Sequence, residues 1–315
     1  MIITVTPNPS IDRTYELPVL VPGEVHRAAR RHQEPSGKGV NVTRALTVNR
    51  VPSLAVLPCG GPAGRELTGL LDAEQVRYRA VPVSGPVRMN ISLTEPGGRT
   101  TKINEAGPSL SASELEQLTE NALAAARPGD WIVCSGSLPP GAPRDYYARV
   151  GQRAHQAGLR FALDTSGQAL AAGLDAAPEI VKPNVSELSE VTGTRITTLG
   201  QAITRARELR SRGADSVVVS LGPDGAALVT GDGAWHASAQ APVIRSTVGA
   251  GDALLAGFLA AGGSGPPALR EAVTWATAAI GVEGSHMPVL SDGPRAAIHV
   301  ELADEAHAPL ARRLT

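Results

Sequence analysis

Short apolar runs alternate with amphipathic stretches along most of the chain. After Pro108, the runs DWIVCSGS, LRFALDTS and SVVVSLG are typical of buried strands, and the segments between them have the apolar spacing of helices. MIITVTPN and SLAVLPCG predict two further strands nearer the start. Strands that alternate with helices favour a mostly parallel sheet with helices on both faces. We therefore expect an α/β core.

Two segments interrupt this alternation. Residues 12–31 and 86–106 contain short stretches in which apolar and polar positions partly alternate, and Gly97-Gly98 is a hairpin signal. Such strands do not fit a parallel sheet. We predict that the two segments form one small β lid, and that residues 1–11, 32–85 and 107–315 form the core. Apolar spacing in the core predicts helices over 37–50, 64–75, 111–127, 144–158, 198–213, 249–261 and 267–282.

Composition narrows the classes of partner. The chain has 315 residues, 29 basic and 30 acidic, and a formal net charge of −1, which favours neither nucleic acid nor a membrane surface. The first residues do not read as a signal peptide, and no apolar run is long enough to span a bilayer. Cys59 and Cys134 lie in strand-like runs without metal-site spacing, as core residues do in a reducing compartment. We expect a cytoplasmic protein.

Lysine usage points to particular segments. Only Lys38, Lys102 and Lys182 are lysines, in SGKGVN, TTKINEAG and VKPNVSE, and every other basic residue is an arginine. Chance explains any one of these positions. An ammonium group is a compact charge that suits phosphate oxygens and is not freely replaced by a guanidinium group. The three segments therefore become candidates for a phosphate-binding site.

The stretch STVGAGDALLAGF places glycines and a carboxylate at the start of an apolar helix. Gly249 and Gly251 allow a ligand to approach the backbone closely, and the first N–H groups of the helix form an anion site. Asp252 falls in the first turn. An Asp in this position often only stabilises the helix dipole, but capping does not require two glycines.

Two interpretations of this anion site compete. A dinucleotide-binding GxGxxG motif fails because Leu254 stands at the third glycine position, and the chain has no GxxxxGK[ST] loop. Phosphoryl transfer fits better. The N–H groups of Gly249 to Asp252 would hold the developing charge on the transferred group, and the side chain of Asp252 would accept the proton of the attacking hydroxyl.

Three further segments offer ligand groups. The loop SGKGVNVTRAL brings Lys38 and Asn41 to a helix start, although an ordinary turn would look the same. In VKPNVSEL, Asn184 and Glu187 have oxygen atoms suited to hydrated Mg²⁺, but they also have the spacing of a helix capping box. SLGPDG ends a strand and would either cover phosphates or form a simple β-turn.

The order of these motifs resembles one family. TPNPSIDRTY, SGKGVNVTRAL, KINEAGP, CSGSLPPG, KPNVSEL and STVGAGDA occur as in PfkB (ribokinase-like) carbohydrate kinases, and the pattern is most similar to the 1-phosphofructokinase group. The resemblance implies a three-layer α/β/α core with a mostly parallel sheet and a β-sheet lid. It also implies ATP as phosphate donor, Mg²⁺ as cofactor, and a homodimer formed through the lids.

The resemblance also assigns roles to residues. It implies that Asp252 is the general base and that Gly249 to Gly251 form an anion hole. Asp12, Gly37 and Asn41 would bind sugar hydroxyls, and Lys38 and Arg88 would lie near the substrate phosphate. The residues implied to contact the nucleotide, its phosphates or Mg²⁺ are Lys182, Asn184, Glu187, Ser220, Gly222 and Gly225.

The sequence departs from the family pattern at two positions and leaves the substrate open. Ser36 stands where most members have a glycine, and Val248 where many have a threonine. The implied reaction is phosphorylation of fructose 1-phosphate at O6. Tagatose 6-phosphate and fructose 6-phosphate remain alternative substrates, because the C1 and C6 phosphates of a ketofuranose are pseudo-symmetric. A non-catalytic sugar-phosphate sensor is the alternative from another class, although a sensor would not need the base.

Overall fold

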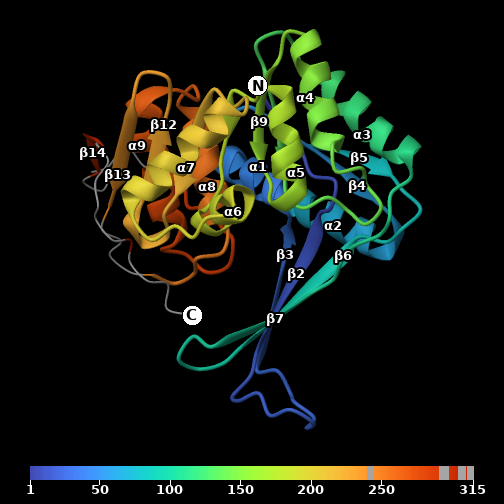
Figure 1. Ribbon diagram of the computed structural model, residues 1–315. Helices are drawn as coiled ribbons and strands as arrows, with labels where there is room; N and C mark the ends of the chain where they lie inside the picture. The colour runs from blue at the N-terminus through green and yellow to red at the C-terminus, as the bar shows by residue number, and fades with distance from the viewer. Residues whose placement is uncertain (240–243, 291–297, 304–309, 311–315) are drawn as a thin grey trace.

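The computed structural model describes residues 1–239, 244–290, 298–303 and 310. A large twisted sheet with helices on both faces makes up most of the molecule, and a small second sheet projects from its lower edge (Figure 1). No helix in the described part of the chain has both the length and the apolar character needed to cross a bilayer.

The large sheet is parallel through its centre and antiparallel at one edge. In the order given below, the six neighbouring pairs from the β5 edge to β11 run parallel, and the three remaining pairs, from β11 to the β14 edge, are antiparallel. The order is β14 (His299–Leu302), β13 (Ala234–Ser238), β12 (Ala226–Val229), β11 (Ser216–Ser220), β10 (Ile180–Val181), β9 (Arg160–Asp164), β8 (Trp131–Ser135), β1 (Ile2–Val5), β4 (Ser53–Cys59), β5 (Tyr78–Pro82).

Side chains on the central strands supply two separate cores. Ile132 and Cys134 of β8 enter one apolar cluster, whereas Trp131 and Val133 enter the other, as the two-residue period of a strand requires. The first cluster is covered by α3 (Ala112–Leu123), α4 (Tyr146–Gln156), α5 (Gly167–Gly173), α6 (Val185–Thr192) and α7 (Leu199–Ser211). The second cluster is covered by α1 (Lys38–Val48), α8 (Ala250–Ala260) and α9 (Gly265–Ala279). A third, smaller apolar cluster lies between α2 (Gly61–Ala73) and β4.

The small sheet has the order β3 (Arg30–Ser36), β2 (Ser10–Glu16), β6 (Arg88–Thr94), β7 (Thr100–Asn104). Its register divides the side chains between two faces. Ile11, Tyr15, Ile91 and Leu93 share one face, and Ile11 packs with α2. Asp12, Asn90 and Glu34 share the other face.

The observed architecture confirms the predicted α/β/α core and the additional small sheet. The hairpin predicted at Gly97-Gly98 joins β6 to β7, and Ser111 and Glu114 form a capping box at α3. The first two strands of the small sheet, β2 and β3, begin at Ser10 and end at Ser36, so they reach beyond the segment 12–31. The predicted helix 267–282 ends at Ala279. The last predicted core stretch lies partly outside the described residues.

Candidate functional site

The predicted site residues gather where the parallel strands end. Asp164 is the last residue of β9, Lys182 directly follows β10, and Ser220 ends β11. Parallel strands bring their carboxyl ends to one edge of a sheet, which is the usual ligand-binding edge of open α/β sheets. Helices α1 and α8 begin at the same edge and add Lys38 and Asp252.

Asp252 is buried and held by one amide. The residue is 8% exposed, and Nδ2 of Asn41 donates a 2.8 Å hydrogen bond to Oδ2 of its side chain. Burial and the negative charge of Asp164 raise the pKa of Asp252 from 3.8 to about 6, against the opposing effects of Lys38, Asn41 and Lys182. A carboxyl group with this pKa is ionised at neutral pH yet still accepts a proton readily, as a general base must.

Two lysines converge beside this carboxylate. Nζ of Lys38 lies 2.9 Å from Oδ1 of Asp164 and 2.8 Å from Oε1 of Glu187, and Nζ of Lys182 lies 3.2 Å from Oδ2 of Asp164. Burial alone would raise the pKa of Asp164, but the two ammonium groups hold it below its usual range. Lys102, the third lysine of the sequence, lies on the exposed strand β7, away from this cluster.

The start of α8 has the geometry of an anion site. Gly249 has a φ of 76°, which favours glycine, and a Cβ there would lie 3.2 Å from Cβ of Ser285. A Cβ on Gly251 would lie 3.5 Å from Nζ of Lys182, so a cation stands beside the helix start. The N–H of Asp252 donates to the Gly249 carbonyl oxygen at 3.0 Å, and that of Ala250 makes a long, 3.5 Å contact with the Thr247 carbonyl oxygen. The N–H of Gly251, and that of Ala250 once its long contact is given up, are therefore the better anion donors.

Asn184 and Glu187 form the helix capping box that their spacing in the sequence predicts. Oδ1 of Asn184 accepts from the N–H of Glu187 at 2.8 Å, and Oε2 of Glu187 accepts from the N–H of Asn184 at 2.9 Å. Glu187 also binds Lys38 through its other oxygen. The two residues therefore cap α6 and lie at the lysine cluster at the same time.

Asp12 stands on the small sheet among three polar side chains. Its Oδ1 accepts from the hydroxyl of Ser10 at 2.8 Å and from Nδ2 of Asn90 at 2.9 Å, and its Oδ2 accepts from the hydroxyl of Ser36 at 2.9 Å. Ser36 is the residue that replaces a glycine of the family pattern. Gly37, which follows it, is the N-cap of α1. The substitution thus adds a hydrogen bond that orients Asp12.

Arg88 lies where the small sheet joins the core. Its Nη1 donates to the carbonyl oxygen of Glu105 at 3.0 Å, and burial lowers its pKa against the opposing charges of Asp12 and Glu105. Arg88 lines a pocket of about 320 Å³ with Pro86, Val87, Glu105, Ala106, Gly107 and Pro108.

The SLGPDG segment forms a short 3₁₀ turn after β11. Asn184 and Ser220 form an isolated parallel bridge, which places this turn beside the lysine cluster. A Cβ on Gly225 would lie 2.0 Å from the carbonyl oxygen of Ala237, so packing against β13 explains that glycine. Gly222 has a φ of 66° and open space around it. Only Gly222 of this pair leaves room for a ligand.

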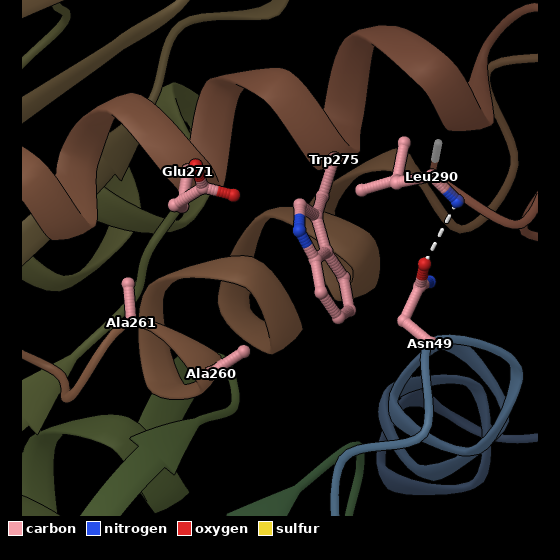
Figure 2. A pocket seen from close by; sticks show the side chains of 6 residues that line it. All are labelled: Asn49, Ala260, Ala261, Glu271, Trp275 and Leu290. Atoms are coloured by element: carbon pink, nitrogen blue, oxygen red, sulfur yellow. Dashed lines mark hydrogen bonds between the residues drawn. The ribbon is translucent and has the colours of Figure 1, made fainter. Parts of the chain in front are cut away.

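A larger pocket, of about 410 Å³, lies elsewhere. Figure 2 shows that Asn49, Ala260, Ala261, Glu271, Trp275 and Leu290 line it, with the Leu290 N–H donating to Oδ1 of Asn49. Asn49 follows the last turn of α1, and Ala260 ends α8. The predicted site residues that these two helices carry, among them Lys38 and Asp252, lie at the opposite, N-terminal ends. This pocket is therefore separate from the lysine cluster.

Sequence reasoning missed Asp164, Ser10 and Asn90. Asp164 ends the buried run FALD, so the rule that placed Lys182 at a strand end would have placed it too. Asn90 gives no such signal, because its role depends on pairing between β2 and β6.

Comparison with known proteins agrees with the geometry. The family model described as pfkB family carbohydrate kinase matches residues 5–291. The chain therefore belongs to this family, whose members are phosphotransferases that act on a hydroxyl group.

Relatives narrow the substrate class to sugar phosphates. The chain is 38% identical over 310 residues to a 1-phosphofructokinase of Haloferax volcanii, covering 96% of this chain and 98% of that one. It is 37% identical over 259 residues to an ATP-dependent 6-phosphofructokinase isozyme 2 of Mycobacterium tuberculosis, covering 81% and 76%. Phosphofructokinase-2 of Escherichia coli in complex with potassium has a TM-score of 0.86 at 32% identity, covering 91% and 95%. The protein is a sugar-phosphate kinase.

Proposed function

We propose that the protein transfers the γ-phosphoryl group of ATP to O6 of fructose 1-phosphate, giving fructose 1,6-bisphosphate and ADP. The observation that carries this proposal is the buried Asp252, oriented by Asn41 at the start of α8, next to two lysines. Relatives named 1-phosphofructokinase favour fructose 1-phosphate over the alternatives.

Asp252 acts as general base in this proposal. It takes the proton from the O6 hydroxyl while O6 attacks the γ-phosphorus in line with the leaving ADP oxygen. The N–H groups at the start of α8 and the ammonium group of Lys182 stabilise charge on the transferred oxygens. Base and anion site thus serve opposite sides of one displacement.

ATP and Mg²⁺ belong at the edge of the lysine cluster. The turn at Ser220, Gly222 and Gly225 would receive the nucleotide, and Gly222 has the open space for close approach. Asn184 and Glu187 offer oxygen atoms, which Mg²⁺ prefers, so the donor set fits the ion. Both side chains are already engaged in the α6 cap. They would therefore hold Mg²⁺ through its waters, and the bound ion would neutralise phosphate charge.

The sugar phosphate belongs between the small sheet and the core. Asp12, Gly37 and Asn41 would bind hydroxyls, and Arg88 would bind the phosphate already on the sugar. Lys38 has two carboxylate partners, Asp164 and Glu187, so it reaches a phosphate only by exchanging one of them. This makes Arg88 the principal phosphate ligand of the proposal.

We also propose that the segments 12–31 and 86–106 act as a lid and join two copies of the chain. The apolar face of the small sheet carries Tyr15, Ile91 and Leu93 beyond the part that packs on α2, and Ile103 opposite Ile91 is 54% exposed. A second copy would cover this face. The polar face with Asp12 would close over the substrate and exclude water.

A coupled assay of ADP release tests the substrate. Fructose 1-phosphate, fructose 6-phosphate and tagatose 6-phosphate are compared at fixed ATP and Mg²⁺. The proposal expects the highest kcat/KM with fructose 1-phosphate. A higher kcat/KM with fructose 6-phosphate or tagatose 6-phosphate would make that sugar the substrate instead. Binding of a sugar phosphate with no turnover of any of the three would favour the non-catalytic sensor.

A further inference from the structure

A cluster of two histidines and one glutamate lies outside the proposed reaction site. His32 and Glu34 are two residues apart on β3, so they share one face of the small sheet. His286 comes from the chain after α9. The ligand atoms of the three side chains all lie within 4.8 Å of one another. No step of the proposed phosphoryl transfer uses them.

The distances match those of a tetrahedral metal site. Nε2 of His32 lies 2.8 Å and Nε2 of His286 lies 3.1 Å from the same oxygen, Oε1 of Glu34. Ligand atoms on one tetrahedral zinc ion lie about 3.4 Å apart, so small movements admit the ion. The two imidazole ring centres are 5.7 Å apart and tilted by 55°. Imidazoles that share a zinc ion have centres about 5–6 Å apart.

Glu34 has the support that a metal-binding carboxylate needs. Its Oε2 accepts from the N–H of Ser285 at 3.0 Å and from the Ser285 hydroxyl at 2.7 Å, which leaves Oε1 for the ion. These two hydrogen bonds fix the orientation of the carboxylate, as outer-shell partners of a metal ligand do.

Solvent reaches the cluster from one side. The side chains of His32 and His286 are 57% and 46% exposed, whereas that of Glu34 is 6% exposed. A metal ion can enter between the two imidazoles and keep a water molecule as its fourth ligand.

Arg44 opposes the metal and must adjust. Its Nη2 lies 3.3 Å from Nδ1 of His286, and that nitrogen carries the proton once Nε2 binds a metal. The contact is long, and the same guanidinium group holds Glu74 at 2.6 and 2.7 Å. Arg44 therefore keeps its stronger partner when the weak contact to His286 is lost.

We propose that His32, Glu34 and His286 bind a borderline divalent transition-metal ion, of which Zn²⁺ is the best match. Imidazole nitrogens select such ions over Mg²⁺, which requires oxygen ligands, so the kinase metal does not compete. The ion would join β3 of the small sheet to the segment at Ser285 that packs against Gly249. Metal binding would thus tie the small sheet to the start of α8.

The test is a titration of the full chain with Zn²⁺ at pH 7.5 in millimolar Mg²⁺, followed by competition with a chromophoric chelator. Co²⁺ serves as a second probe, because its visible absorption reports four-coordinate geometry. We expect one ion per chain. His32→Asn and His286→Asn should each weaken binding by at least about tenfold, since even outer-shell partners contribute about 10- to 100-fold.

His155→Asn is the matched control. His155 also pairs with a glutamate, Glu179 at 3.0 Å, but it belongs to no such three-residue cluster among the described side chains. It should bind Zn²⁺ like the unchanged protein. Both test positions are exposed, and thermal unfolding checks that the variants remain folded. Absence of one-to-one binding, or equal binding by all variants, would overturn the proposal.

Discussion

Replacing Asp252 by asparagine should remove activity and stabilise the fold together. Asp252→Asn keeps the size of the side chain, and its oxygen can still accept from Asn41, but it no longer accepts a proton. If Asp252 is the base, turnover should fall by about 10²- to 10⁴-fold. A residue that only stabilised the α8 dipole would not give this loss.

The gain in stability follows from the raised pKa. A carboxyl group whose pKa rises from 3.8 in the unfolded chain to about 6 in the fold disfavours folding when it is ionised. The cost is about 3 kcal/mol, is present in full above pH 6, and shrinks as the pH falls below 6. An amide carries no such cost. Asp252→Asn should therefore raise the melting temperature at pH 7.5 by about 3–5 °C, and by about half as much at pH 5.

Calorimetric or fluorescence melting at both pH values, with initial rates on the same samples, measures both effects. Asp145→Asn is the control, because the side chain of Asp145, the N-cap of α4, is 45% exposed, makes no capping hydrogen bond and pairs with the exposed Arg149. It should change stability by less than about 0.5 kcal/mol and leave the rate unchanged. Near-normal turnover of Asp252→Asn would refute the reasoning. So would a gain in melting temperature over the unchanged protein that is smaller at pH 7.5 than at pH 5.

Three more predictions test the neighbouring groups. Arg88→Ala should raise KM for the sugar phosphate about 10- to 100-fold and leave KM for ATP nearly unchanged, since a charge-assisted contact contributes about 1.5–3 kcal/mol; equal rises would place Arg88 elsewhere. Glu187→Gln should increase the Mg²⁺ concentration needed for activity, whereas Glu114→Gln, which alters the similar capping box of α3, should lower only the stability. If Glu187→Gln also lowered only the stability, Glu187 would be a helix cap without a role at Mg²⁺. Leu93→Asp should halve the mass measured by light scattering at micromolar concentration and increase ATP hydrolysis without sugar, whereas Ser92→Asp on the opposite face should keep the mass; a monomeric unchanged protein would remove the dimer.

The core of the fold could be predicted because its strands are apolar and its helices are amphipathic. The small sheet was harder to delimit, since all five residues of β7 are exposed and burial gives its strands no clear period. Helix α5 was not predicted, because its seven residues, GQALAAG, are too few to show helical spacing. Strand β14 was not assigned either, because its four residues, HVEL, are too few to show a clear period and three of them are exposed.

The candidate site was predictable where a motif is local. Gly249 and Asp252 lie within four residues, so the helix start and the carboxylate are visible together. The partners of Lys38 cannot be predicted in this way, because Asp164 and Glu187 lie 126 and 149 residues away from it in the chain. The sequence showed Ser36 only as a departure from the family pattern, whereas in the structure its hydroxyl donates to Asp12 on the neighbouring strand. Such pairings depend on sheet register and helix packing, which composition and spacing do not encode.

A single-turnover experiment with ATP labelled at the γ-phosphate tests the central claim most directly. Enzyme in excess over ATP is mixed with fructose 1-phosphate and Mg²⁺, quenched rapidly, and the labelled products are separated. The account predicts that the label appears on O6 of the sugar as fructose 1,6-bisphosphate, and that Asp252→Asn slows this transfer by at least about 100-fold while still binding ATP. Label found only in inorganic phosphate, or transfer to the sugar at an unchanged rate in Asp252→Asn, would contradict it.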